Sequence, residues 1–202
     1  MGNQNSIMSH SNSSSSSGSL QLFIGCMYAG KTTKLIETYN EVLDDDNYSD
    51  QSVIILTHSS ENRYSLDGLS THDKTKIACL KYNSILSFVE NEQVAIESSA
   101  LILIDEGQFF DDLSSVVLLV EKFHKHVCVF GLDGDFKRNK FGKILDLIPF
   151  CDTVEKLQAT CKCGDPAIFS NRTVKNDSQI LVGSTDTYEP LCRKCYIENN
   201  IL

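Results

Sequence analysis

The sequence Gly25-Cys26-Met27-Tyr28-Ala29-Gly30-Lys31-Thr32 sets the fold class, because it fits the pattern G-x-x-x-x-G-K-[ST] of a phosphate-binding loop. An apolar run at residues 20–24 predicts a strand before it, and helical spacing at residues 32–43 predicts a helix after it. In that context backbone N–H groups surround phosphate oxygens at a helix N-terminus. We therefore expect the whole stretch to bind ATP, with Lys31 on the terminal phosphates and the Thr32 hydroxyl on Mg²⁺.

Strand-like and helix-like segments alternate around this loop. Strands are predicted at residues 52–57, 76–80, 100–105 and 126–132, and helices at 84–90 and 113–125. Continuous Val, Ile and Leu runs separated by helices are typical of a parallel sheet covered on both faces. The sequence therefore predicts an α/β nucleotide-binding domain over residues 19–156.

The last part of the chain, residues 157–202, has a different pattern. Short β-type pieces at 167–173 and 179–183 lie between two cysteine pairs, Cys161 with Cys163 and Cys192 with Cys195, and no helical pattern of useful length is present. Because so small a lobe has little core, we expect the four thiolates to bind a structural Zn²⁺, with reduced free thiols as the alternative.

Composition narrows the function classes. The chain has 202 residues, of which 41% are hydrophobic, as a globular protein needs. Its net charge of -9 disfavours a surface that binds the nucleic-acid backbone non-specifically, because such a surface is basic. No apolar run is long enough to span a membrane, no secretory signal is visible, and the cysteines fit a reducing compartment, so we expect a cytoplasmic protein.

The serine-rich residues 1–18 are expected to be disordered. Their start fits the N-myristoylation pattern M-G-x-x-x-[ST] at Gly2, but we favour a plain tail.

A second chemical element is Asp105-Glu106 at the end of an apolar run. A carboxylate there can hold the metal across the cleft, directly or through water, and Asp105 takes this role. Glu106 would lie beside the terminal phosphate and accept a proton from the attacking nucleophile. That nucleophile is water in an ATPase and a hydroxyl in a kinase.

Four phenylalanines favour the kinase. Phe109 and Phe110 follow Glu106, and Phe136 and Phe141 follow the next predicted strand. Ligands bind at the carboxyl ends of parallel strands, so clustered aromatic side chains there suit a planar base.

The string Asp105-Glu106-Gly107-Gln108-Phe109-Phe110, the glycine loop, Leu132-Asp133-Gly134-x-Phe136 and the two cysteine pairs closely resemble the type II thymidine kinases. This family of cytosolic and viral deoxynucleoside kinases has a RecA-like P-loop core and a zinc-bearing lobe with a lasso-like loop. The resemblance runs from about residue 20 to 196. It implies transfer of the ATP γ-phosphate to the 5′-hydroxyl of thymidine, giving dTMP and ADP.

The resemblance also implies residue roles. Glu106 matches the general base, Asp105 the carboxylate that holds Mg²⁺ through water, and Arg63 an arginine near the transferring phosphates. Tyr188 matches a tyrosine whose loop closes over the base. The apolar wall around thymine and sugar is matched by Met27, Phe109, Leu132, Phe136 and Phe141.

Three positions depart from the family pattern. Ser170 stands where threonine usually contacts the thymine methyl, so deoxyuridine is expected as a further substrate. Glu61 replaces an aspartate that helps hold the Mg²⁺ waters, which leaves that role open. The first cysteine pair is C-x-C rather than C-x-x-C.

Two alternatives stand beside the kinase: a zinc-bearing ATPase in which Glu106 activates water, and a nucleic-acid-binding module with a vestigial loop. The acidic balance and the intact Lys31, Thr32, Asp105 and Glu106 disfavour the module. By family analogy we expect a homotetramer inhibited by dTTP.

Overall fold

A computed structural model describes residues 17–44, 52–60, 79–181 and 186–200, and the backbone alone of 69–70 and 76–77. Six strands form one sheet in the order β5-β2-β6-β7-β1-β8, and every neighbouring pair is parallel. These strands are β1 (Ser19–Gly25), β2 (Val53–His58), β5 (Leu80–Tyr82), β6 (Leu101–Asp105), β7 (His126–Gly131) and β8 (Thr153–Leu157). The predicted α/β class is confirmed.

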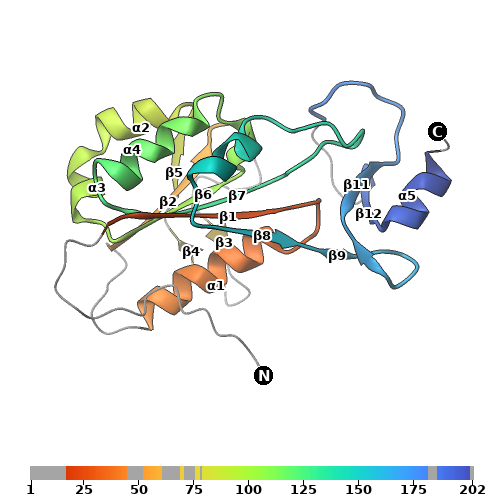
Figure 1. The fold of residues 1–202 in the computed structure, drawn as a ribbon, viewed down its shortest axis with the longest axis horizontal. Coiled ribbons are helices and arrows are strands. Elements are labelled where there is room, and N and C mark those ends of the chain that lie inside the picture. Colours follow the sequence, from red (N-terminus) through yellow and green to blue (C-terminus); the bar gives the residue numbers. More distant parts are fainter. Residues whose placement is uncertain are drawn as a thin grey trace.

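Helices cover both faces of this sheet (Figure 1). One face carries α1 (Lys31–Leu43), and the other carries α2 (Ile85–Asn91), α3 (Gln93–Ser98) and α4 (Val116–Glu121). Side chains alternate along each strand, so in β6 Ile102 and Ile104 pack with the α2–α4 layer while Leu101 and Leu103 pack with α1. Burial on both faces is the reason that these strands read as continuous apolar runs.

The remaining elements are short. The described residues include the 3₁₀ helices η2 (Gly107–Phe109), η3 (Leu113–Ser115) and η4 (Ile144–Phe150), and β3 (Leu69–Ser70) pairs with β4 (Lys76–Ile77). A small lobe lies beyond the end of the sheet and contains β9 (Ala159–Thr160), β10 (Pro166–Ala167), β11 (Phe169–Arg172), β12 (Tyr188–Leu191) and α5 (Arg193–Asn199) (Figure 1). Its own core consists of Cys161, Ala167, Leu191, Cys192 and Tyr196.

The structure corrects several predicted elements in the sheet domain. The helix predicted over 113–125 is split into η3 and α4 and ends at Glu121, because Phe123 bonds back to Leu118 and His124 adopts a left-handed conformation (φ 53°) before β7. The strand predicted at 76–80 is divided between β4 and β5, and only β5 joins the sheet. The helix α3 and the strand β8 were not anticipated. Because β8 is a largely exposed edge strand, it lacks the apolar run of its neighbours.

Two further corrections concern the lobe. The expectation of no useful helix was wrong, since α5 spans seven residues from its cap at Cys192; so short a helix shows little periodicity. Residues 179–181 form no strand, and β11 pairs instead with β12. The domain boundary at 156/157 stays a prediction, with β8 ending at Leu157.

No helix among the described residues is long and apolar enough to cross a membrane. The tail covered by the predictions of disorder and myristoylation lies outside the described residues, apart from residues 17 and 18.

Candidate active site and metal centre

The glycine loop connects β1 to α1, as predicted. Gly30 caps α1 in a left-handed conformation (φ 81°), which glycine adopts without strain. Lys31 is buried at the first helical position, and its Nζ donates to the backbone oxygens of Cys26 at 2.8 Å and Gly25 at 3.3 Å. The ammonium group therefore lies against the loop, and Thr32 follows half-buried in the first turn.

The first two residues of the loop, Gly25 and Cys26, pack against β8 and β10. A Cβ on Gly25 would lie 2.5 Å from the backbone oxygen of Leu157, so only glycine lets β1 and β8 approach so closely. The Cys26 thiol donates to the oxygen of Ala167 at 3.5 Å, and burial raises its pKa. Cys26 is thus a protonated packing group rather than a reactive thiolate.

The loop also contacts the small lobe. The Met27 N–H donates to Ser170 Oγ at 3.0 Å, and Ser170 is buried in β11. Tyr28 is exposed with φ 65°, and the Ala29 N–H closes a turn onto Cys26 at 3.3 Å. The hydroxyl of Ser170 therefore couples the phosphate loop to β11.

Asp105 and Glu106 lie at the carboxyl end of β6. Only β7 separates β6 from β1, so this pair and the glycine loop lie at the same edge of one parallel sheet. Both carboxylates are buried, and Asp105 Oδ1 accepts the Glu106 N–H at 2.9 Å. Glu106 is left-handed (φ 54°) at the turn from β6 into η2, a conformation that is strained for a non-glycine residue and found preferentially at functional sites.

The side-chain amide of Gln108 connects this carboxylate to the next strand. Its Nε2 donates to Glu106 Oε2 at 2.5 Å, and its Oε1 accepts the Leu132 N–H at 2.9 Å. Two glycines leave room for it, since a Cβ on Gly131 would lie 2.5 Å from Gln108 Oε1 and one on Gly142 would lie 2.0 Å from its backbone oxygen. Sequence reasoning quoted Gln108 within the motif but assigned it no role.

Aromatic residues follow the same strand ends. Phe109 packs edge-to-face on Phe141 with ring centroids 5.7 Å apart. The Arg172 guanidinium lies over the Phe136 ring, with its carbon 3.7 Å from the ring centroid. Phe110 does not belong to this group, because it is fully buried in the core under α2 and α4, which corrects its predicted place beside the base.

Tyr188 opens β12 and is buried. Its hydroxyl accepts from Arg172 Nη2 at 2.6 Å and donates to the oxygen of Leu181 at 3.0 Å. Arg172 was predicted only as part of a strand, and nothing in its spacing signals this contact. Arg63 and Glu61 lie outside the described residues, so their predicted roles remain predictions.

The four predicted zinc ligands come together. The sulfur atoms of Cys161, Cys163, Cys192 and Cys195 all lie within 4.8 Å of one another, close to the roughly 3.8 Å that four thiolates about 2.3 Å from one Zn²⁺ would have. The C-x-C pair closes through a turn in which the Gly164 N–H donates to the Cys161 oxygen at 2.8 Å, with Gly164 left-handed (φ 94°).

Electrostatics at the cluster also fit a cation. Backbone N–H groups of Cys163 and Cys192 lower the pKa of Cys161 to about 6, whereas hydrogen bonds with the Cys163 and Cys192 side chains raise the pKa of Cys195 to about 12. Without a metal, the sulfur groups thus hydrogen-bond to one another, and a divalent cation would favour the thiolate form of each. The donor set fits a structural Zn²⁺.

Comparison with known proteins gives a family. The family model "Thymidine kinase" matches residues 18–196. The chain belongs to the thymidine kinase family. It is 39% identical over 188 residues to "Thymidine kinase" of Oryza sativa subsp. japonica, covering 92% of this chain and 68% of that relative.

Bacterial and viral relatives agree. The chain is 39% identical over 182 residues to "Thymidine kinase" of Bacteroides thetaiotaomicron, covering 89% of this chain and 87% of the relative. It is 38% identical over 183 residues to "Thymidine kinase" of Monkeypox virus, covering 90% and 98%. Membership of this family supports phosphorylation of thymidine, and the zinc-bearing ATPase is not favoured.

Proposed function

We propose that this thymidine kinase family member transfers the γ-phosphate of ATP to the 5′-hydroxyl of thymidine, releasing dTMP and ADP. One observation carries the proposal: Glu106 and the glycine loop occupy the same edge of the sheet, with only β7 between their strands. A base at this position can take the hydroxyl proton while the loop holds the phosphates.

The phosphates are assigned to residues 25–32. Loop N–H groups and the N-terminus of α1 would surround them, and Lys31 would move from the carbonyls of Gly25 and Cys26 to the terminal phosphates. The Thr32 hydroxyl and, through water, the buried Asp105 carboxylate offer the oxygen ligands that Mg²⁺ prefers. When bound, Mg²⁺ neutralises charge on the phosphates.

The nucleoside is assigned to the space between the side chains of Met27, Leu132, Phe136, Phe141 and Phe109, with the loop before Tyr188 over the base. Ser170 lies next to these residues, since its hydroxyl accepts a hydrogen bond from the Met27 N–H. It presents no methyl group to thymine, so we propose deoxyuridine as a second substrate.

Further properties are proposed from the family. We propose a homotetramer inhibited by dTTP in the nucleoside pocket, a structural Zn²⁺ in the lobe, a cytoplasmic location, and no nucleic-acid or membrane partner. Two residue roles and the domain boundaries are also proposed. Arg63 is proposed to stabilise charge on the transferring phosphate, and Glu61 to help hold the Mg²⁺ waters. The chain is proposed to divide into a tail, a nucleotide-binding domain and a zinc lobe, with boundaries at residues 18/19 and 156/157.

ADP formation from ATP and Mg²⁺, measured with and without thymidine, tests the proposal. We expect turnover that depends on thymidine, and Glu106→Gln to lower kcat by about a hundredfold or more while ATP binding survives. Glu121→Gln, an exposed change of the same kind in α4, is the control and should leave turnover unchanged. Rapid hydrolysis without thymidine would instead indicate the ATPase.

A further inference from the structure

The last residue of β11, Arg172, has a buried guanidinium that binds a neighbouring loop. Nη1 donates to the backbone oxygens of Asn176 at 2.7 Å and Ser178 at 2.6 Å, and Nη2 donates to that of Gln179 at 3.1 Å. Nε and Nη2 both donate to the Tyr188 hydroxyl, at 3.2 and 2.6 Å. One side chain therefore binds the backbone of three residues in the loop between β11 and β12.

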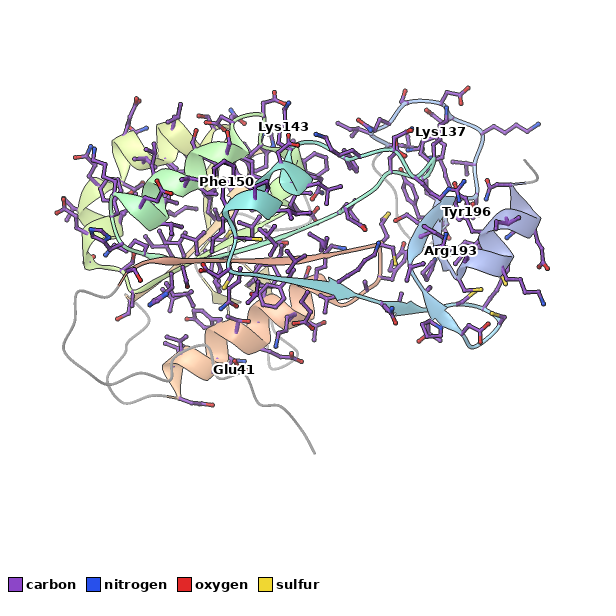
Figure 2. All side chains as sticks on the ribbon, viewed as in Figure 1. Glu41, Lys137, Lys143, Phe150, Arg193 and Tyr196 are labelled. Atoms are coloured by element: carbon purple, nitrogen blue, oxygen red, sulfur yellow. The ribbon has the colours of Figure 1, made fainter. Side chains whose placement is uncertain are left out.

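The same group joins the loop to the proposed nucleoside wall. Its guanidinium carbon is 3.7 Å from the centroid of the Phe136 ring, and Tyr188, which it binds, donates in turn to the oxygen of Leu181. The hydroxyl of Tyr196, in the lobe, donates to the Phe136 oxygen at 2.6 Å, and Figure 2 shows Tyr196 on the same side of the molecule as Lys137, which follows Phe136 in the sequence. Wall, loop and β12 thus meet at Arg172.

The direct contacts of the Arg172 guanidinium are with neutral groups. No carboxylate of the described residues lies within ion-pair distance of it, so carbonyl oxygens, a hydroxyl and an aromatic face surround the cation. At longer range its charge adds to the Lys137 hydrogen bond in lowering the pKa of Asp177, in the same loop. A planar fork with five donors can bind several carbonyls at once, whereas a lysine ammonium offers three donors from one point.

Other ties to this loop are weaker. The Lys137–Asp177 ion pair joins side chains that are 48% and 95% exposed, and such pairs contribute little. Gln179 Nε2 donates to Asp135 Oδ2 at 3.0 Å from a position that is itself exposed. Residues 174–180 are all exposed and form no regular structure. Among these described contacts, the buried anchors are Arg172 and Tyr188, to which Arg172 is hydrogen-bonded.

We propose that Arg172 is a positioning residue that holds residues 176–181 in a binding-competent arrangement over the nucleoside and thereby sets the affinity for it. This rests on the proposed thymidine kinase function. A loop ordered before binding loses less conformational entropy when the nucleoside arrives, so its anchor acts on nucleoside binding rather than on phosphate transfer.

The test compares Arg172→Lys with wild type in the full-length enzyme. We expect the KM for thymidine to rise by about tenfold or more, with kcat and the KM for ATP changed by less than about threefold. Arg138→Lys is the control, because Arg138 stacks on Phe169 and Tyr196 of the lobe and makes no described contact with residues 174–181. It should leave all three constants near wild type.

Hydrogen exchange gives a second readout that needs no turnover. Amides of residues 174–181 should exchange faster in Arg172→Lys than in Arg138→Lys, while those of β6 and β7 stay protected. The inference is overturned if the thymidine KM of Arg172→Lys equals that of the control, or if kcat alone falls. Lack of thymidine-dependent turnover in wild type would instead overturn the proposed function, and equal exchange of the loop in both variants would overturn the inference separately.

Discussion

Gln108 Nε2 donates to Glu106 Oε2 across 2.5 Å. The orientation of that amide is determined from its other end, because the Leu132 N–H can only donate and therefore faces the amide oxygen, at 2.9 Å. The amide NH₂ must then point at Glu106, where it requires an acceptor. The hydrogen bond therefore fixes the orientation of the carboxylate that is proposed as the general base.

Replacing Gln108 by Leu should impair the proposed base. Without the donor, the Glu106 carboxylate loses the hydrogen bond that fixes its orientation. We expect kcat to fall by about tenfold, because a general base must lie within hydrogen-bond reach of the proton that it takes. Steady-state kinetics measure this, with the exposed Gln93→Leu in α3 as control. A kcat equal to that of the control would contradict the role of Gln108.

Ser170→Thr should raise selectivity for thymidine over deoxyuridine. Threonine retains the hydroxyl that accepts the Met27 N–H and adds a methyl group toward the proposed base site. One buried methyl contributes about 0.8 kcal/mol, so the ratio of the two kcat/KM values should rise about fourfold. Ser170→Ala removes the acceptor and should raise KM for both nucleosides without this gain. An unchanged ratio in Ser170→Thr would place the thymine methyl elsewhere.

The cysteine cluster should hold about one zinc per chain. Cys163→Ser is expected to lose most of the metal and to lower the melting temperature of the lobe, because its own core is small. Metal analysis and thermal unfolding measure both effects. Cys151→Ser is the control, since Cys151 lies outside the cluster. Well under one zinc in folded wild-type protein would contradict the assignment.

Asp112→Asn should destabilise the protein in a pH-dependent way. Asp112 accepts from Ser84 Oγ at 2.7 Å and from the Ile85 and Leu86 N–H groups at 2.9 Å, at the start of α2. Burial alone would raise its pKa, but the amide and hydroxyl bonds outweigh burial and lower it below 3.8. A depressed folded-state pKa means that this stability is present at neutral pH and lost as the pH falls through that value.

We therefore expect Asp112→Asn to cost about 1 kcal/mol at pH 7 and less near pH 3. Denaturant unfolding at both pH values measures the difference. The neighbouring exposed Asp111→Asn serves as control. Equal losses at the two pH values would show that the negative charge of Asp112 is not the stabilising feature.

Features encoded within a few consecutive residues could be predicted from the sequence. Residues Gly25 to Thr32 form the loop, and Leu101 to Asp105 form the buried strand that ends in an acidic residue. Each of these predictions needed only local spacing. Elements whose stability comes from neighbours were missed: β8 is an exposed edge held by β1, and α5 is short and packs on β11 and β12 through Tyr196.

Residue type and local order along the chain were sufficient for the fold class, the phosphate loop and the four cysteines, because glycine conformation, strand hydrophobicity and thiol chemistry depend on the residues themselves. Three-dimensional packing alone established the contacts that couple them. Met27 meets Ser170 across 143 positions, Gln108 meets Leu132 across 24, and Arg172 meets Tyr188 across 16. Such hydrogen bonds have no signature in spacing, since they depend on where parallel strands end relative to one another and on which loops the small lobe brings against them.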